Sequence, residues 1–192
     1  SITSIGFSQS IVERNKAKLN DDIYVTGNIG DSFLGLKIIK SNIKINFKLK
    51  KYFISKFYCP NLPYKIYKLI NKFANTSIDI SDGLVSDMYK LINDQFLSFE
   101  INVNKIPISK NLEVYIKKYN KVKNQFLFHG DDYQVLFTAS KKKRLLIKSL
   151  AKKLNQKITI IGKINNGYKK NLIKFDNKPQ NLTNFKGYSH TF

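Results

Sequence analysis

The stretch IDISDGLVSD, residues 78–87, most constrains the fold of this chain because it marks a sharp junction between a strand and a helix. Residues 77–80 alternate like the end of a strand, and the apolar residues of 83–94 recur at the spacing of an amphipathic helix. Ser81 or Asp82 is a favoured N-cap for that helix. The pattern therefore predicts a strand that runs directly into a helix with one buried face.

The carboxylates at this junction indicate a site for metal and phosphate. Asp79 and Asp82 would lie at the N-terminus of the helix, where free backbone amides and the positive end of the dipole favour phosphate. Their oxygens suit a hard cation such as Mg²⁺. In the alternative interpretation, Asp82 only caps the helix and Asp79 is solvated. Asp87 lies one turn inside the helix, and we expect it at the surface.

Three further stretches accompany this motif. FHGDDYQVLFTA (128–139) places a glycine and two acids before an alternating strand, and DIYVTGNIGDSFLGL (22–36) has the pattern of a strand, a glycine-bearing turn and a helix. GYSH stands at 187–190. In this order and at these separations, the four stretches resemble the thiamine-monophosphate kinase family, within the superfamily of aminoimidazole ribonucleotide synthetase. The resemblance covers essentially the whole chain.

The resemblance implies contacts with metal and nucleotide at four residues. Asp79 and Asp82 would ligate Mg²⁺, and Ser81 would contact ATP. Arg14 matches a family arginine that binds the nucleotide. Without the resemblance, an isolated arginine on a connector is simply solvated.

The resemblance also implies an acceptor site and a reaction. Asp131, where the family usually has Glu, and Tyr188 would contact thiamine monophosphate. The γ-phosphoryl group of ATP would pass to that phosphate, giving thiamine diphosphate and ADP. Because the acceptor is already an anionic phosphate oxygen, the acids are needed to hold Mg²⁺ rather than to abstract a proton. No catalytic acid or base is therefore assigned.

The start of the chain departs from the family pattern. Residues 1–7 alternate like a strand, and the family carries an N-terminal domain with further metal-binding aspartates ahead of this point. We therefore expect residues 1–20 to be the last strand and connector of a truncated N-terminal ATP-binding domain, and residues 21–192 to form a C-terminal α+β domain. We expect this chain alone to be inactive, and the resemblance implies a homodimer for the full-length protein.

Composition limits the classes of partner. The formal charge is +21, but the 34 basic residues are lysines except for Arg14 and Arg144, and they are scattered along the chain. Proteins that recognise a nucleic-acid sequence rely on arginine, so we expect no specific nucleic-acid partner. No apolar run approaches the ~20 residues that span a bilayer, and no signal-peptide pattern opens the sequence. We expect a cytoplasmic protein without membrane contact.

Cysteine and histidine are too few for several kinds of site. Cys59 is the single cysteine, so no disulfide framework forms, and we expect a partly buried thiol. His129 and His190 are too scattered for a transition-metal site or a catalytic triad.

Helices and strands mix along the chain without a strict βαβ order, which favours an α+β fold. The resemblance implies the same, a mixed sheet covered by helices. Periodicity predicts helices over 31–40, 60–73, 109–120 and 141–154, and strands over 98–103, 133–137, 158–164 and 172–175. In the helix over 141–154, Leu146, Leu150 and Leu154 would form the buried face. Residues 43–49 alternate as in a strand, whereas the resemblance implies a helix or a loop there.

Two other functions stay open. One is a different ATP-using enzyme of the same superfamily, such as an aminoimidazole ribonucleotide synthetase-like ligase, although the GDDYQVLF and GYSH stretches argue against it. The other is a non-catalytic remnant or binding module. A screen of acceptor substrates would separate the two enzyme classes.

Overall fold

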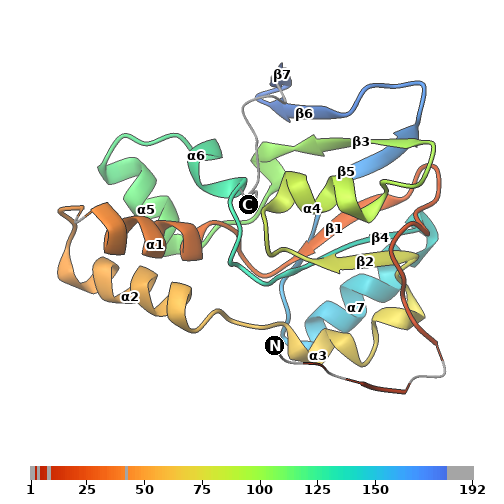
Figure 1. Cartoon of the computed structure of the whole chain (residues 1–192), viewed down its shortest axis with the longest axis horizontal. Coiled ribbons are helices and arrows are strands. Elements are labelled where there is room, and N and C mark those ends of the chain that lie inside the picture. The colour runs from red at the N-terminus through yellow and green to blue at the C-terminus, as the bar shows by residue number, and fades with distance from the viewer. Residues whose placement is uncertain (1–2, 4, 8–9, 42, 181–192) are drawn as a thin grey trace.

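The computed structural model describes residues 3, 5–7, 10–41 and 43–180. These residues form a mixed seven-stranded sheet with helices packed around it (Figure 1). The strands are β1 (Asp22–Thr26), β2 (Thr76–Asp79), β3 (Leu97–Asn102), β4 (Val135–Ala139), β5 (Ile158–Asn166), β6 (Leu172–Phe175) and β7 (Lys178–Gln180). Their order in the sheet is β2-β4-β1-β5-β3-β6-β7, and only the β3–β6 pair is parallel. The predicted α+β class with a mixed sheet is confirmed.

The two faces of the sheet bury different side chains. Along β1, Ile23 and Val25 belong to one core cluster, while Tyr24 between them belongs to another. Successive strand residues point to opposite faces, so both faces of β1 are covered. The strand is buried at all five positions and pairs with β4 and β5 on its two sides.

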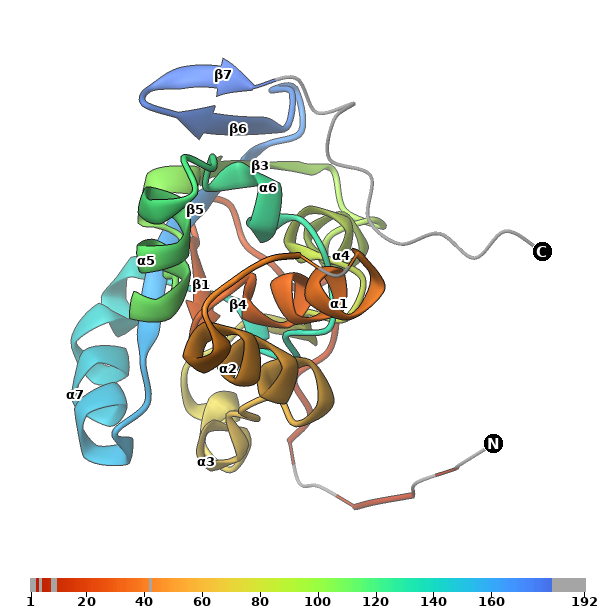
Figure 2. The same ribbon diagram turned by 90° about the vertical axis from the view of Figure 1, so that its left-hand side faces the viewer.

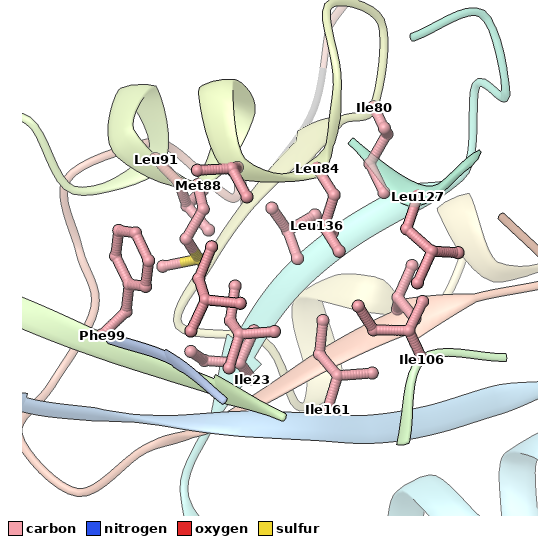
Figure 3. Close-up of a cluster of buried hydrophobic side chains, with 14 of the residues drawn as sticks. Ile23, Ile80, Leu84, Met88, Leu91, Phe99, Ile106, Leu127, Leu136 and Ile161 are labelled. Carbon is pink, nitrogen blue, oxygen red and sulfur yellow. The ribbon is translucent and has the colours of Figure 1, made fainter. Parts of the chain in front are cut away.

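The first cluster lies between the sheet and α4 (Leu84–Leu91). Leu84, Met88 and Leu91 extend from this helix toward the sheet, where Leu136 and Ile23 meet them (Figure 3). These five side chains are fully buried. At about 1.5–3 kcal/mol for each buried side chain, this packing fixes α4 over β1 and β4 in the middle of the sheet.

The opposite face is covered by α3 (Tyr64–Tyr67), the 3₁₀ turn η1 (Ile70–Lys72) and α7 (Arg144–Leu154). The rings of Tyr24 and Phe137 stack there with centroids 4.9 Å apart. Ile66 and Ile147 are buried against them.

A lobe of four helices stands beside one end of the sheet (Figures 1 and 2). It consists of α1 (Asp31–Ser41), α2 (Phe47–Tyr58), α5 (Lys110–Lys118) and α6 (Asn124–Leu127). Leu34, Phe53, Leu112 and Phe126 form its core. Two further 3₁₀ turns are η2 (Val103–Lys105) and η3 (Lys141–Lys143). No helix in the described part of the chain is long and apolar enough to cross a membrane.

Several predicted elements need correction. The strand pattern at 43–49 is wrong as a strand, because the Asn46 side chain accepts the Lys48 N–H at 2.9 Å and starts α2. The helix predicted over 60–73 is broken into α3 and η1, although its apolar residues still face the core.

Two predictions about burial are also wrong. On α7 the buried residue is Ile147 instead of Leu146, which is exposed. Leu150 is only partly buried in the same cluster. Cys59 is exposed, because it ends α2 at the molecular surface.

The N-terminal segment follows the β2 edge of the sheet. The Thr76 hydroxyl donates to the Glu13 carbonyl oxygen at 2.6 Å, and the Asn15 N–H donates to the Leu91 carbonyl oxygen at 2.9 Å. Of the strand predicted over 1–7, the structure describes residues 3 and 5–7, which are exposed and lie outside the strands. The division at residue 20 stays a prediction.

Candidate active site

Three loops meet at the end of the sheet that faces the helical lobe (Figure 1). β4 lies between β1 and β2, and both neighbours run antiparallel to it. The ends of β1 and β2 are therefore beside the start of β4, where Asp79 pairs with Val135. This register brings loops 27–30, 80–83 and 128–134 together.

The 80–83 and 128–134 loops form one unit through their backbones. The Asp131 N–H donates to the Ser81 carbonyl oxygen at 3.1 Å, and the Tyr133 N–H donates to the Ile80 carbonyl oxygen at 3.0 Å. A Cβ atom on Gly130 would overlap the Ser81 carbonyl oxygen. The IDISDG and FHGDDY motifs are therefore in direct contact.

The N-terminus of α4 is stabilised by Asp87 instead of by Ser81 or Asp82. One carboxylate oxygen of Asp87 accepts the N–H groups of Ser81 at 3.0 Å, Asp82 at 3.0 Å and Gly83 at 3.1 Å. The side chain of Asp87 is fully buried, so the surface position predicted for it is wrong. The predicted cap is also wrong, because the N-cap is Gly83, without a side-chain hydrogen bond.

This arrangement leaves the side chains of the loop for other contacts. Gly83 has a φ of +125°, which lets the chain turn sharply into α4. The side chain of Asp79 is exposed and makes no hydrogen bond or ion pair in the described part of the chain. Its negative charge adds to the effect of burial in raising the pKa of Tyr67. Ser81 and Asp82, which follow shortly after Asp79 in the sequence, are half-buried.

Asp82 is neutralised by a lysine of the next helix. Lys90 forms an ion pair with Asp82 and a second one, at 3.1 Å, with Asp87. The hydrogen bond from Asp82 raises the pKa of Lys90, with burial acting in the opposite direction. Sequence reasoning did not identify Lys90, although its spacing of three residues from Asp87 is that of a helical ion pair.

The carboxylates of Asp79 and Asp82 suit Mg²⁺ in their chemistry. Both are oxygen donors close in sequence, and Asp79 is free to accept a cation. A cation at Asp82 would have to compete with Lys90. Among the described residues, no group of three or more His, Cys, Asp or Glu side chains is placed to hold a metal ion, so the metal-binding role of Asp79 and Asp82 stays a prediction.

Asp131 lies near Asp82. Burial raises the pKa of the Asp131 carboxyl group, and the negative charge of Asp82 raises it further, while Lys40 acts in the opposite direction. Asp131 is half-buried and has a φ of +69°, which is uncommon outside glycine. The structure thus brings Asp82 and Asp131 to one region.

Asp132, which sequence reasoning missed, is buried beside Asp131. It accepts the N–H groups of Gly30 at 2.8 Å and Ser32 at 3.4 Å. Burial raises its pKa to about 8, the two backbone N–H groups oppose this rise, and the negative charge of Asp31 adds to it. The sequence signal that could have identified Asp132 is its position directly after Asp131, a candidate ligand of the acceptor.

A polar pocket of about 230 Å³ adjoins the 128–134 loop, with Asp132 and Gln134 on its wall. Asp31, also on the wall, accepts the hydroxyl of Tyr52 at 2.8 Å and that of Ser109 at 2.7 Å. Burial raises the pKa of Asp31, and these two hydroxyls oppose the rise. These contacts join α1, α2 and the start of α5, and the Thr26 hydroxyl of β1 donates to the Gln134 side-chain oxygen of the loop at 2.9 Å.

For two of the predicted site residues, Arg14 and Tyr188, no contact among the described residues links them to the three loops. Arg14 is exposed on the N-terminal segment, between the anchored residues Glu13 and Asn15, and it makes no hydrogen bond or ion pair with the described residues. Tyr188 lies outside the described residues. The roles of both stay predictions, as do the other ligand assignments.

Comparisons with known proteins agree with the motifs. The thiamine-monophosphate kinase of Buchnera aphidicola subsp. Acyrthosiphon pisum is 38% identical over 178 residues, which are 92% of this chain and 54% of that protein. The solved structure of AaThiL complexed with AMPPCP and TMP has a TM-score of 0.76 at 31% identity, over 94% of this chain and 54% of that one. This chain is a homologue of the thiamine-monophosphate kinases. It spans about half the length of the curated relatives it matches.

The fold extends to more distant proteins. The structure of Escherichia coli HypE, a hydrogenase maturation protein, has a TM-score of 0.60 at 10% identity, over 90% of this chain and 52% of that one. This likeness concerns the fold alone and confirms the predicted aminoimidazole ribonucleotide synthetase-like architecture. No protein-family model matches the sequence.

Proposed function

We propose that this chain supplies the metal-binding and acceptor-binding part of an enzyme that transfers the γ-phosphoryl group of ATP to thiamine monophosphate. The contact between the 80–83 and 128–134 loops carries the proposal, since it brings Asp82 and Asp131 from separate motifs to one end of the sheet. The kinase relatives support the reaction, and the AaThiL complex with the ATP analogue AMPPCP and with TMP supports both substrates.

Each predicted residue takes one role in this proposal. The proposed ligands are Asp79 and Asp82 for Mg²⁺, Ser81 and Arg14 for ATP, and Asp131 and Tyr188 for the acceptor. Bound Mg²⁺ would neutralise the charge of the phosphate groups. The chain's own task is to orient two anions, because a phosphate oxygen attacks without the removal of a proton. The carboxylate of Asp131 would attract the cationic ring of the acceptor.

We propose the complete activity only for a protein that also contains a region equivalent to the part of the relatives that this chain does not match. We propose that the 192-residue chain alone does not turn over, since Asp79 and Asp82 are its only two proposed metal ligands and its described residues contain no group of three or more ligand-type side chains. We further propose that the full-length protein is a cytoplasmic homodimer without a specific nucleic-acid or membrane partner.

Calorimetric titration of the chain with thiamine monophosphate tests the acceptor role. We expect binding, and we expect Asp131→Asn to weaken it about tenfold, because the attraction to a cationic ring is lost. Glu113→Gln is the matched control, since Glu113 is an exposed acid of α5 that pairs with Lys117 at 3.0 Å. A chain that binds a ribonucleotide acceptor instead of thiamine monophosphate would contradict the proposal and favour the ligase class.

Turnover tests the metal role. The chain with ATP, Mg²⁺ and thiamine monophosphate should form no thiamine diphosphate, and clear product would contradict the need for further ligands. In the full-length enzyme, Asp82→Asn should reduce activity by orders of magnitude with little change in the melting temperature, because Asp87 holds the helix N-terminus. Tyr188→Ala should weaken acceptor binding about two- to thirtyfold and leave ATP binding unchanged.

A further inference from the structure

Asp132 stands between two residues with unusual backbone conformations. Asp131 has a φ of +69° and Tyr133 a φ of +48°, both in the left-handed region that favours glycine. Such conformations persist only when surrounding contacts determine them. Contacts with other parts of the protein must therefore hold the segment that carries Asp131 in this conformation.

The Asp132 side chain supplies the long-range part of that restraint. Its two carboxylate oxygens accept the N–H groups of Gly30 at 2.8 Å and Ser32 at 3.4 Å, at the start of α1. Asp132 is 4% exposed, so these bonds are shielded from water. They join the acceptor loop to the helical lobe at residues about 100 positions earlier in the chain.

The backbone supplies the rest. The N–H groups of Asp131 and Tyr133 donate to the carbonyl oxygens of Ser81 and Ile80. With the side chain of Asp132 turned to Gly30 and the amides on either side of it turned to the 80–83 loop, the segment is bound on two sides. The side chain of Asp131 is left half-exposed, near Asp82.

We propose that Asp132 is a positioning residue for the acceptor site, which holds Asp131 against the 80–83 loop by binding the start of α1. It does not touch the substrate. This inference rests on the proposed function for its effect on substrate binding. The restraint of the loop itself can be measured without a ligand.

The experiment compares Asp132→Ala and Asp132→Asn with Asp31→Asn at pH 7.5, at a temperature where circular dichroism shows each variant folded. Ala removes both acceptors, whereas Asn keeps one oxygen acceptor and should have an intermediate effect. Asp31 is the matched control, because it is also buried and adjacent to Ser32, whereas among the described residues its carboxylate accepts the hydroxyls of Tyr52 and Ser109 and no N–H group of the acceptor loop.

Amide hydrogen exchange measured by NMR tests the restraint. In Asp132→Ala, the amides of Asp131 and Tyr133 should exchange about tenfold faster or more, while the Ile164 amide in the sheet, which donates to Asp21 at 2.8 Å, should change far less. Asp31→Asn should show no selective change at the loop. Equal acceleration at all amides would overturn the positioning role and leave Asp132 as a general stabiliser.

Calorimetry then tests the consequence. Asp132→Ala should weaken thiamine monophosphate binding about tenfold and alter AMPPCP binding less than about twofold, with Asn between Ala and the wild type. Equal losses for both ligands would overturn the inference. If the wild-type chain binds no thiamine monophosphate, the proposed function fails. In that case the hydrogen exchange at the Asp131 and Tyr133 amides still decides whether Asp132 restrains the loop.

Discussion

The carboxylate of Asp87 lies 3.0 Å from the backbone nitrogen of Ser81, and this contact organises the junction between β2 and α4. The same oxygen accepts the N–H groups of the next two residues. Asp87, a residue inside the helix, therefore accepts the N–H groups that an N-cap side chain in front of the helix usually accepts. Asp82, which occupies the expected capping place, points to Lys90 instead.

Asp87→Ala should destabilise the protein by about 3 kcal/mol, because it leaves three backbone N–H groups without their charged acceptor. Asp82→Ala should cost less than about 1 kcal/mol, since it removes a partly exposed ion pair. Urea unfolding of both variants measures the difference. Equal costs would show that Asp82 contributes to the helix start as much as Asp87 does.

Gly130→Ala should destabilise the protein by about 2–3 kcal/mol, because the added methyl group overlaps the Ser81 carbonyl oxygen and forces the two loops apart. Gly6→Ala is the control, since nothing lies within 4 Å of a Cβ atom at that position. Thermal unfolding compares the two. A Gly130→Ala variant as stable as the control would contradict the close contact of the loops.

Lys90→Met should make the protein more responsive to Mg²⁺. The ammonium group of Lys90 neutralises Asp82, so a cation that binds there must displace it, and removing the lysine frees the carboxylate. A ligand that binds only the folded state raises the free energy of unfolding by an amount that grows with the logarithm of its concentration divided by its Kd. Mg²⁺ should therefore raise the melting temperature of the variant more than that of the wild type.

The control for this prediction is Lys148→Met, a substitution at an exposed lysine of α7. It should leave the response to Mg²⁺ unchanged. The same response in Lys90→Met as in the wild type would argue against Asp82 as a metal ligand.

Sequence periodicity predicted those parts of the fold that depend on near neighbours. The junction at 78–87 and the helix at 109–120 were recognisable because an alternating or helical apolar pattern is local. The N-terminus of that second helix also carries its own cap, since the Ser109 hydroxyl oxygen accepts the Leu112 N–H at 3.0 Å. The pattern at 43–49 was ambiguous, because the cap at Asn46 starts α2 in the middle of an alternation of only four apolar residues.

The site was predictable only as a set of motifs. That Asp82 and Asp131 lie near each other followed from the resemblance, since no local pattern pairs the end of β2 with the start of β4. The burial of Asp87 depends on how the 80–83 loop folds back over α4. Asp132 was missed for the same reason, because its partners Gly30 and Ser32 belong to a distant part of the chain.

The pH dependence of stability should contain a contribution from Asp132 that favours low pH. Its pKa is raised in the folded state to about 8 by burial and by the charge of Asp31, whereas an exposed Asp in the unfolded chain titrates near ~3.9. The folded state therefore holds the proton more tightly than the unfolded state does. This contribution is fully present below pH ~4, declines as the pH rises, and is lost above pH ~8.

Urea unfolding of the wild type and of Asp132→Asn, repeated from about pH 4.5 to about pH 9, gives the free energy of unfolding of each protein as a function of pH. The difference between these two curves measures the contribution of Asp132. Because Asn does not titrate, the wild type should lose stability relative to the variant across this range. Burial raises the pKa of Asp31 in the same direction, so Asp31→Asn and the double variant separate the two groups. Parallel curves for the wild type and Asp132→Asn would show that the backbone N–H groups of Gly30 and Ser32 offset the burial of the carboxylate.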